Sequence, residues 1–394
     1  MGEKMKKNVI FTAAIFFFSL NIYAQETAVN IIETRHYRIE IQPGVKIGAE
    51  VLAAELEQRF THFNSVFRFE VSSLKAPLNV KIFSDEYALG SYIAEKTGLR
   101  RNGPLYIHYE NAENRELVVC LTNNDEAEFS HQAFVQFLRG FTANPPAWML
   151  EGFALFFQTM EIHGENLYYR NYSSLLETAK IPEQSAVPVS GILEYNTEPR
   201  SASQQRLFQI KSWAFVSFLL ESGTGDYYRT LTDSFMLLSP DADEEANTMA
   251  VKRHFEMWDS QKTMDSDFNI FLYSLKTFNE YLEDGIKAYQ TGDFEAAAQN
   301  LLPAILLKND HYAPYYYLGL IFYERENYEI AEIYYKSSFE YGADEVLVYY
   351  ALGLNAAAAG NSNDAAEWFR RASEADAQRY GRRSEEMLRN LESY

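Results

Sequence analysis

The chain has 394 residues, a length that predicts two or three folded domains. Its residues are 47% hydrophobic and 23% charged, which is typical of a globular protein and not of a disordered chain. Its 35 Lys and Arg residues against 55 Asp and Glu residues give a formal net charge of −20, which argues against nucleic-acid binding because an acidic surface repels phosphate backbones. The single cysteine, Cys120, excludes an internal disulfide, a thiolate zinc cluster and an iron–sulfur site.

The N-terminal residues 1–24 have the pattern of a secretory signal peptide. Lys4, Lys6 and Lys7 precede an uncharged run over residues 9–20, and Ala24 provides a small residue before a cleavage site. The run is shorter than the roughly 20 apolar residues that span a bilayer, and the alternative interpretation is a buried core helix. No later segment has the pattern of a transmembrane helix. We therefore expect an exported protein, periplasmic or secreted, whose mature chain begins at Gln25.

Residues 25–275 are expected to form the first domain. Alternating polarity predicts strands over residues 37–41, 78–83, 105–109 and 117–121. Helical spacing predicts a helix over 48–67 and a second one that Ser84 caps and that reaches Tyr92. Residues 30–122 thus form a small α/β layer. From Glu126 to about Lys276 the pattern is helical, interrupted at Pro145-Pro146, by a long loop over 181–203 and by a turn at residues 239–241.

The C-terminal third contains an internal repeat of 34 residues. Three glycines recur at this period, each is followed twelve residues later by alanine, and a large apolar residue comes four positions after that. These residues are Gly285, Gly319 and Gly353, then Ala297, Ala331 and Ala365, then Leu301, Tyr335 and Phe369. The pattern resembles three tetratricopeptide repeats over residues 278–311, 312–345 and 346–379, followed by a capping helix over 380–394.

Small residues let two helices of a pair approach closely, so we expect Gly319 to face Ala331 and the large residues to fill the groove toward the next pair. The resemblance implies a protein or peptide partner in the groove of the repeats. Because the repeats are themselves acidic, an acidic partner is disfavoured. The predicted fold class is therefore α+β, a small α/β layer with a helical subdomain, followed by an all-α solenoid.

The middle of the chain carries a second resemblance. A helix is expected over residues 123–138, with Asn123 or Asn124 as its cap, and it is followed by the sequence PPAWMLEGFA over residues 145–154. This arrangement resembles the peptidase-MA-like, gluzincin-type metallopeptidases, over about residues 30–275, with 211–219 matching a further helix downstream. In that family an H-E-x-x-H helix supplies two zinc ligands and a glutamate base, and the glutamate of the second helix is the third ligand.

At the matching positions the chain keeps His131 and Glu151, but Gln132 replaces the base and Val135 replaces the second histidine. An amide is not a base at neutral pH and valine has no lone pair, whereas a catalytic zinc needs three protein ligands. Gln136 cannot substitute, because it is rotated by about 100° around the helix. The resemblance therefore implies an inactive peptidase without bound zinc.

Two alternatives stay open at this site. One is an atypical zinc metallopeptidase with a rebuilt site, for which His108 on a predicted strand is the candidate ligand. The other is that His131 and Glu151 are ordinary structural residues of two helices, the glutamate being favoured near a helix N-terminus. Only the rebuilt site would need a cofactor, namely zinc.

The strand before the metal helix forms the edge of the cleft in the family that the chain resembles. Here that place is taken by Leu117, Val118, Val119, Cys120 and Leu121. Such a strand could hold a peptide by strand addition, without cleaving it. The alternative is an ordinary internal strand in which Cys120 is a small buried apolar residue.

Together these patterns predict an exported binding or scaffold protein of the cell envelope, with an inactive gluzincin-like domain in front of the repeats. The enzyme hypothesis is the rebuilt zinc metallopeptidase. A third hypothesis is a plain repeat adaptor whose front domain contributes only stability.

Overall fold

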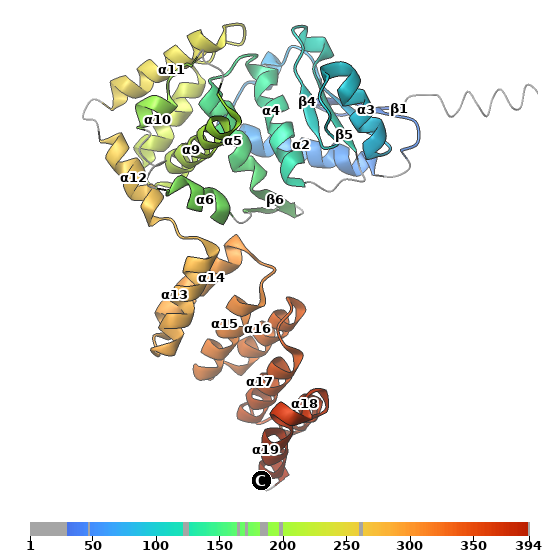
Figure 1. Cartoon of the computed structure of the whole chain (residues 1–394), viewed down its shortest axis with the longest axis vertical. Helices are drawn as coiled ribbons and strands as arrows, with labels where there is room; N and C mark the ends of the chain where they lie inside the picture. Colours follow the sequence, from blue (N-terminus) through green and yellow to red (C-terminus); the bar gives the residue numbers. More distant parts are fainter. Residues whose placement is uncertain are drawn as a thin grey trace, which may run out of the picture. The chain divides into compact units, whose positions relative to one another are not determined.

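The computed structural model describes residues 30–45, 48–120, 126–163, 166–169, 172–181, 188–196, 200–259 and 263–392. The chain divides into two compact units, one made of residues up to 160 and 182–272, the other of residues 161–181 and 273–394 (Figure 1). The predicted signal peptide, 1–24, lies outside the described residues. An α/β region followed by a long all-helical region confirms the predicted fold class.

The N-terminal unit contains a mixed five-stranded sheet in the order β1-β2-β3-β5-β4. Its strands are β1 (Asn30–Glu33), β2 (Tyr37–Ile41), β3 (Leu78–Phe83), β4 (Leu105–Ile107) and β5 (Glu116–Cys120). Strands β2, β3 and β5 run parallel, and β1 and β4 lie antiparallel at the two edges. The helices α2 (Ala49–Phe67) and α3 (Glu86–Thr97) make the crossovers that parallel pairing requires. Sequence patterning missed β1 because its side chains are mostly exposed.

Strand β5 is internal, which corrects the suggestion that residues 117–121 form an edge. Leu117 pairs with Val80 of β3 on one side and with Tyr106 of β4 on the other. The chain folds back after β4, so β4 forms the edge and covers β5. All five residues of β5 are buried, as expected for a strand between two neighbours. Leu121 lies outside the described residues.

The start of α3 also differs from the prediction. The cap is Asp85, whose carboxylate accepts a hydrogen bond from the backbone N–H of Ala88 at 2.8 Å. Ser84 instead donates its hydroxyl to the Asp85 carboxylate. The helix continues beyond Tyr92 to Thr97 and ends at Gly98, which has a φ of 73°.

Helices complete the N-terminal unit: α4 (Glu126–Phe141), α5 (Ala147–Gln158), α8 (Val189–Ile192), α9 (Ala202–Glu221), α10 (Gly225–Phe235), α11 (Glu244–Trp258) and α12 (Met264–Ser274). Helix α5 packs very closely on α9, since a Cβ atom on Gly152 would lie 2.5 Å from the carbonyl oxygen of Ser212. The stretch predicted as helical also contains a hairpin of β6 (Met160–His163) and β7 (Asn166–Tyr169). Strands of four residues show too few alternations to be recognised between helices.

The second unit is a helical repeat region. Three helix pairs follow one another: α13 (Phe278–Gln290) with α14 (Phe294–Leu307), α15 (Tyr312–Glu324) with α16 (Tyr328–Glu340), and α17 (Glu345–Ala358) with α18 (Ser362–Ala375). A π-helical turn η3 (Ala377–Gly381) and α19 (Arg382–Glu392) end the region, and α6 (Ser173–Ala179) joins it from earlier in the chain.

The signature residues of the repeat lie in the cores of these pairs. A Cβ atom on Gly319 would lie 2.6 Å from the ring of Tyr335, so the glycine receives the large residue of its own pair. Ala331 and Tyr335 both belong to a buried cluster with Val348 and Leu352 of the following pair. Tyr335 therefore fills the space beside Gly319 and also packs toward the following pair, as predicted for the large residues. In the first pair a Cβ atom on Gly285 would lie 3.4 Å from the carbonyl oxygen of Ala297, so there the glycine and the alanine of one pair lie close together.

Candidate functional site

The four positions of the gluzincin-like pattern lie on two helices that pack together. His131, Gln132 and Val135 are on α4, and Glu151 is on α5. The chain reverses between the helices at Pro145-Pro146, and α5 begins directly after Pro146. Proline suits this place because it lacks an N–H that the first helical turn would leave without a partner.

His131 and Glu151 have separate partners. The Nδ1 atom of His131 lies 3.1 Å from Oε1 of Gln158, the last residue of α5. The two carboxylate oxygens of Glu151 accept hydrogen bonds from Gln205 and Gln209 of α9, at 3.1 and 2.8 Å. The sequence patterns did not single out these three glutamines, because contacts between helices leave no signal in local spacing.

The described residues do not form a three-ligand metal site. Among them, no group of three or more His, Cys, Asp or Glu side chains could hold a metal ion. Val135 is half-buried on α4 and offers no donor atom. The residues present at the gluzincin-like positions therefore do not fit the zinc of the family that the sequence resembles.

Gln132 uses both polar atoms of its side chain in the structure. Its Oε1 accepts a hydrogen bond from the backbone N–H of Tyr106 at 2.9 Å, and its Nε2 donates to Oε1 of Glu128 at 2.8 Å. Tyr106 is the central residue of the edge strand β4. A buried amide on α4 thus occupies an N–H that an edge strand would otherwise offer to an added strand.

His108, the candidate substitute ligand, follows directly after β4. Desolvation lowers its pKa to about 4, with a further contribution from the positive charges of Arg139 and Arg115, although part of the ring is open to solvent. A neutral imidazole can bind a metal, but within the described residues His108 does not join His131 and Glu151 in a metal-binding group.

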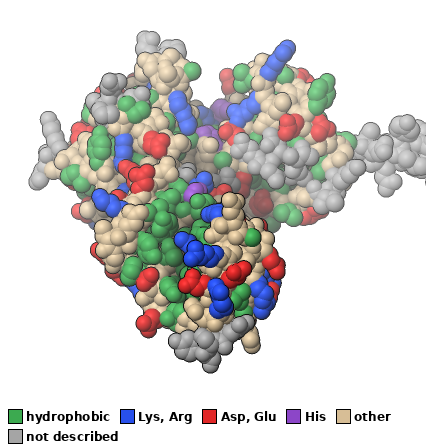
Figure 2. All heavy atoms as spheres, turned by 60° about the horizontal axis from the view of Figure 1, so that its bottom comes forward, with side chains coloured by type: hydrophobic (Ala, Val, Ile, Leu, Met, Phe, Trp, Pro, Cys, Tyr) green, Lys and Arg blue, Asp and Glu red, His purple; other side chains and the backbone are tan. Residues whose placement is uncertain are grey.

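The helical unit contains a cavity of about 340 Å³ lined largely by tyrosine and leucine side chains. They come mainly from α15 and α17 and include Tyr316, Leu320, Tyr323, Tyr350, Leu354 and Tyr380. Glu324 and Arg383 add one charge of each sign to the lining. In Figure 2, where the helical unit comes forward, hydrophobic side chains gather in a patch bordered by charged ones.

The glycines and alanines of the repeat do not line this cavity but support the helices that do, whereas Tyr335, one of the large repeat residues, is part of the lining. Within the described helix pairs they are all buried: Gly285, Ala297, Gly319, Ala331, Gly353 and Ala365. The repeat pattern therefore predicts where the helices lie. It does not predict which tyrosines line the cavity, because that depends on how the helices pack.

No protein-family model and no curated protein matches the chain when the sequences are compared. In the part of the chain that the structure describes, helices long and apolar enough to cross a bilayer are absent.

Proposed function

We propose that the protein binds a protein or peptide segment in the tyrosine-lined cavity of its helical repeats and acts as a scaffold. The cavity itself carries this proposal, because half-buried tyrosines offer large, rigid contact surfaces with a polar hydroxyl at the tip. The resemblance to tetratricopeptide repeats supports the same role. Residues 278–379 contain 17 acidic and 7 basic residues, a net charge of −10, so we expect a neutral or basic segment.

We further propose that the front unit has no peptidase activity. Gln132 cannot accept a proton from a metal-bound water, and its amide already joins α4 to the edge strand. Glu151 and His131 have glutamine partners on different helices. These contacts favour a structural use of the positions that a metallopeptidase would use for chemistry.

Binding in the cavity can be tested by selecting peptides from a displayed library on the full chain and measuring their affinity by fluorescence anisotropy. Tyr323→Ala removes a lining ring and should weaken the selected peptides about tenfold or more, the effect expected for a central aromatic contact. Tyr312→Ala, at an exposed position of the same helix α15, is the matched control and should leave affinity unchanged. Selected peptides with an acidic excess, or equal affinity for both variants, would contradict the proposal.

The absence of peptidase activity has its own test. Wild-type protein should bind Zn²⁺ weakly and should not cleave a mixed peptide library. Val135→His places a second histidine four residues after His131 and should raise zinc affinity, while Gln132→Glu adds a base and should alter affinity little. Any hydrolysis should require both changes. Stoichiometric zinc and cleavage in the wild type would establish the rebuilt metallopeptidase instead, and a folded double variant without improved zinc binding would refute the gluzincin-like placement.

Export is proposed from the N-terminal pattern alone. Intact-mass measurement of the protein recovered from the envelope fraction should give a chain that begins at Gln25. A chain that still begins at Met1 would contradict processing after Ala24.

A further inference from the structure

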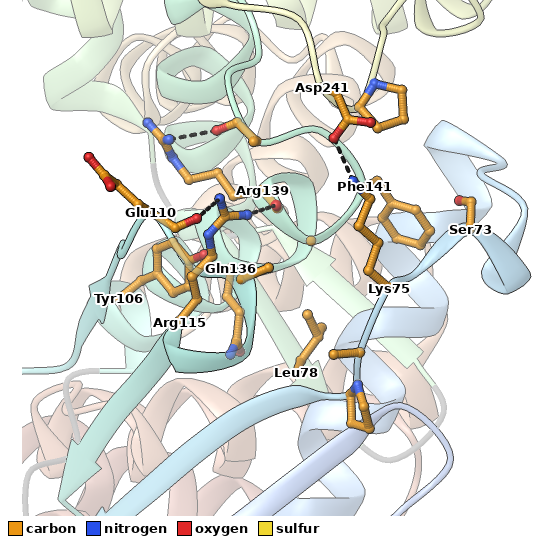
Figure 3. A pocket seen from close by; sticks show the side chains of 16 residues that line it. Ser73, Lys75, Leu78, Tyr106, Glu110, Arg115, Gln136, Arg139, Phe141 and Asp241 are labelled. Carbon is orange, nitrogen blue, oxygen red and sulfur yellow. Dashed lines mark hydrogen bonds and ion pairs between the residues drawn. The ribbon is translucent and has the colours of Figure 1, made fainter.

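The N-terminal unit contains a second cavity, of about 170 Å³, on the side of the sheet that α4 covers (Figure 3). Its wall is formed by the last turns of α4, by Tyr106 of β4, by the segment before β3 and by the turn around Asp241. It lies apart from the tyrosine-lined cavity, since all its lining residues belong to the other unit.

Two arginines line this cavity without forming an ion pair to any described carboxylate. Arg115 donates to three backbone carbonyl oxygens, those of Tyr109 at 2.9 Å and of Glu110 and Arg139 at 3.4 Å. Arg139 donates from one Nη atom to the carbonyl oxygen of Ala143 at 2.8 Å. A guanidinium has several further N–H donors, so both groups keep capacity for a ligand.

The acidic side chains of the cavity do not neutralise these arginines. Asp241 is paired with Lys75 at 2.5 Å on the rim. The exposed side chain of Glu110 points away from Arg115, and only its backbone carbonyl turns toward the guanidinium (Figure 3). Two like charges are thus held side by side in a chain whose net charge is −20.

Partial burial of Arg115 and Arg139 disfavours two neighbouring positive charges in the absence of an anion. Desolvation lowers the pKa of Arg139, Tyr106, Glu244 and Glu151 compensate in part, and the nearby charge of Arg115 adds to the lowering. A half-buried charge that has no carboxylate in direct contact costs free energy, part of which an anionic ligand would recover.

The side chain of Gln136 adds a second requirement for a ligand of this cavity, namely a hydrogen-bond donor. Its Nε2 donates to the carbonyl oxygen of Asn79 at 2.7 Å, but its Oε1 is buried and has no hydrogen-bond partner in the structure. The side chain is 1% exposed, so the free acceptor faces the interior and not bulk solvent. A buried carbonyl of this kind needs a donor, which a bare anion does not provide.

We propose that this cavity binds a small ligand that carries a free carboxylate beside an N–H donor, the chemistry of the C-terminal residue of a peptide. The fork of N–H groups on Arg139 matches a carboxylate, and the neighbouring Arg115 adds positive charge. The N–H of the ligand supplies the donor that Gln136 lacks. The small volume admits the end of a chain and not a folded domain.

The proposal is tested by calorimetric titration of the full chain with three probes: acetyl-Gly-Gly with a free carboxylate, the same dipeptide as its C-terminal amide, and inorganic phosphate. The free carboxylate should bind and the amide should not. Arg139→Gln should weaken binding about tenfold or more, the usual effect of losing a charge-assisted hydrogen bond. Arg206→Gln removes the same charge from an exposed position of α9 and should leave binding unchanged.

Arg139→Lys provides a second variant in case Arg139→Gln does not fold. It keeps the charge but loses the fork, so affinity should fall by less than in Arg139→Gln. Equal binding of acid and amide, or no binding of the acid at millimolar concentration, would overturn the proposal. Phosphate binding as tight as that of the acid would also overturn it, because the N–H donor would then contribute nothing.

Discussion

The amide of Gln132 makes two hydrogen bonds that the sequence alone does not predict. Its carbonyl oxygen and its NH₂ group face different partners, the N–H of Tyr106 and the carboxylate of Glu128. An amide can accept from one and donate to the other, which a carboxylate cannot do. A glutamate, the residue of an active gluzincin, would keep the first hydrogen bond and place two carboxylates against each other.

Gln132→Glu should therefore destabilise the front unit by about 1–3 kcal/mol at neutral pH, because a buried donor is replaced by a like charge. Burial and Glu128 would raise the pKa of the new carboxyl in the folded state, so the loss should disappear below about pH 4, where the group is protonated in both states. Urea unfolding across pH measures both effects. Gln299→Glu, at an exposed glutamine that donates to Glu295 one helical turn earlier, is the control and should cost only a few tenths of a kcal/mol. Equal losses in the two variants would contradict this interpretation.

Glu57 gives a second prediction at the scale of single residues. Burial raises its pKa, but hydrogen bonds from Thr34 and from the ring and backbone of His36 outweigh burial and lower the pKa below its ordinary value. A lowered pKa contributes stability above the unfolded-state pKa of about 4.3, and this contribution is lost as the pH falls through the folded value. Glu57→Gln should thus reduce the free energy of unfolding at pH 7, by an amount that shrinks in acid. Glu50→Gln, which removes an exposed carboxylate from the first turn of the same helix α2, is the control in this unfolding series and should change the free energy of unfolding at pH 7 less than Glu57→Gln.

Element by element, periodicity predicted which segments form helices and strands better than which neighbours they take. The strands at 37–41 and 78–83 have the predicted bounds, since alternation is a local signal. Two contacts depend on how segments fold back on each other: β4 pairs with the outer side of β5, and Tyr335 packs against Gly319. Spacing along the chain cannot decide this, because several partners satisfy the same period.

The close approach of Tyr335 to Gly319 predicts that replacing this glycine with alanine lowers the stability of the helical unit, the reverse of the usual effect in a helix. In a helix, alanine is normally favoured over glycine by up to about 1 kcal/mol. At Gly319 a Cβ atom would lie 2.6 Å from two ring carbons of Tyr335, so Gly319→Ala should destabilise the helical unit, and Gly319→Leu should cost on the order of 1–3 kcal/mol or more. Gly225→Ala at the start of α10, where the new methyl group meets open space, should be neutral or stabilising. Thermal unfolding, followed by limited proteolysis, would measure the stability of the helical unit in each variant. If the Gly319→Ala variant were more stable than the wild type, the two helices would not approach as described.

At the scale of the whole molecule, the helical repeat region includes a segment from the middle of the chain. Residues 161–181 belong to the same compact unit as residues 273–394. Tyr172, just before α6, packs on the buried cluster of Phe278, Ala304 and Leu307 in the first helix pair. The first pair of a solenoid has no preceding repeat to cover it, and this segment supplies part of the cover. The sequence did not predict the contact, because about 100 residues separate its two sides.

The hydroxyl of Ser173 makes this cover specific, because it accepts a hydrogen bond from the backbone N–H of Phe278 at 3.0 Å. That N–H belongs to the first turn of α13 and has no partner within its own helix. Ser173→Ala should leave it unpaired and reduce the stability of the helical unit by about 0.5–1.5 kcal/mol, with the largest loss of hydrogen-exchange protection in α13. Ser174→Ala, at the exposed neighbouring position of the same helical turn, should change neither quantity. If both variants lost protection equally, the effect would come from α6 itself, and the segment would not stabilise the start of the repeats through Ser173.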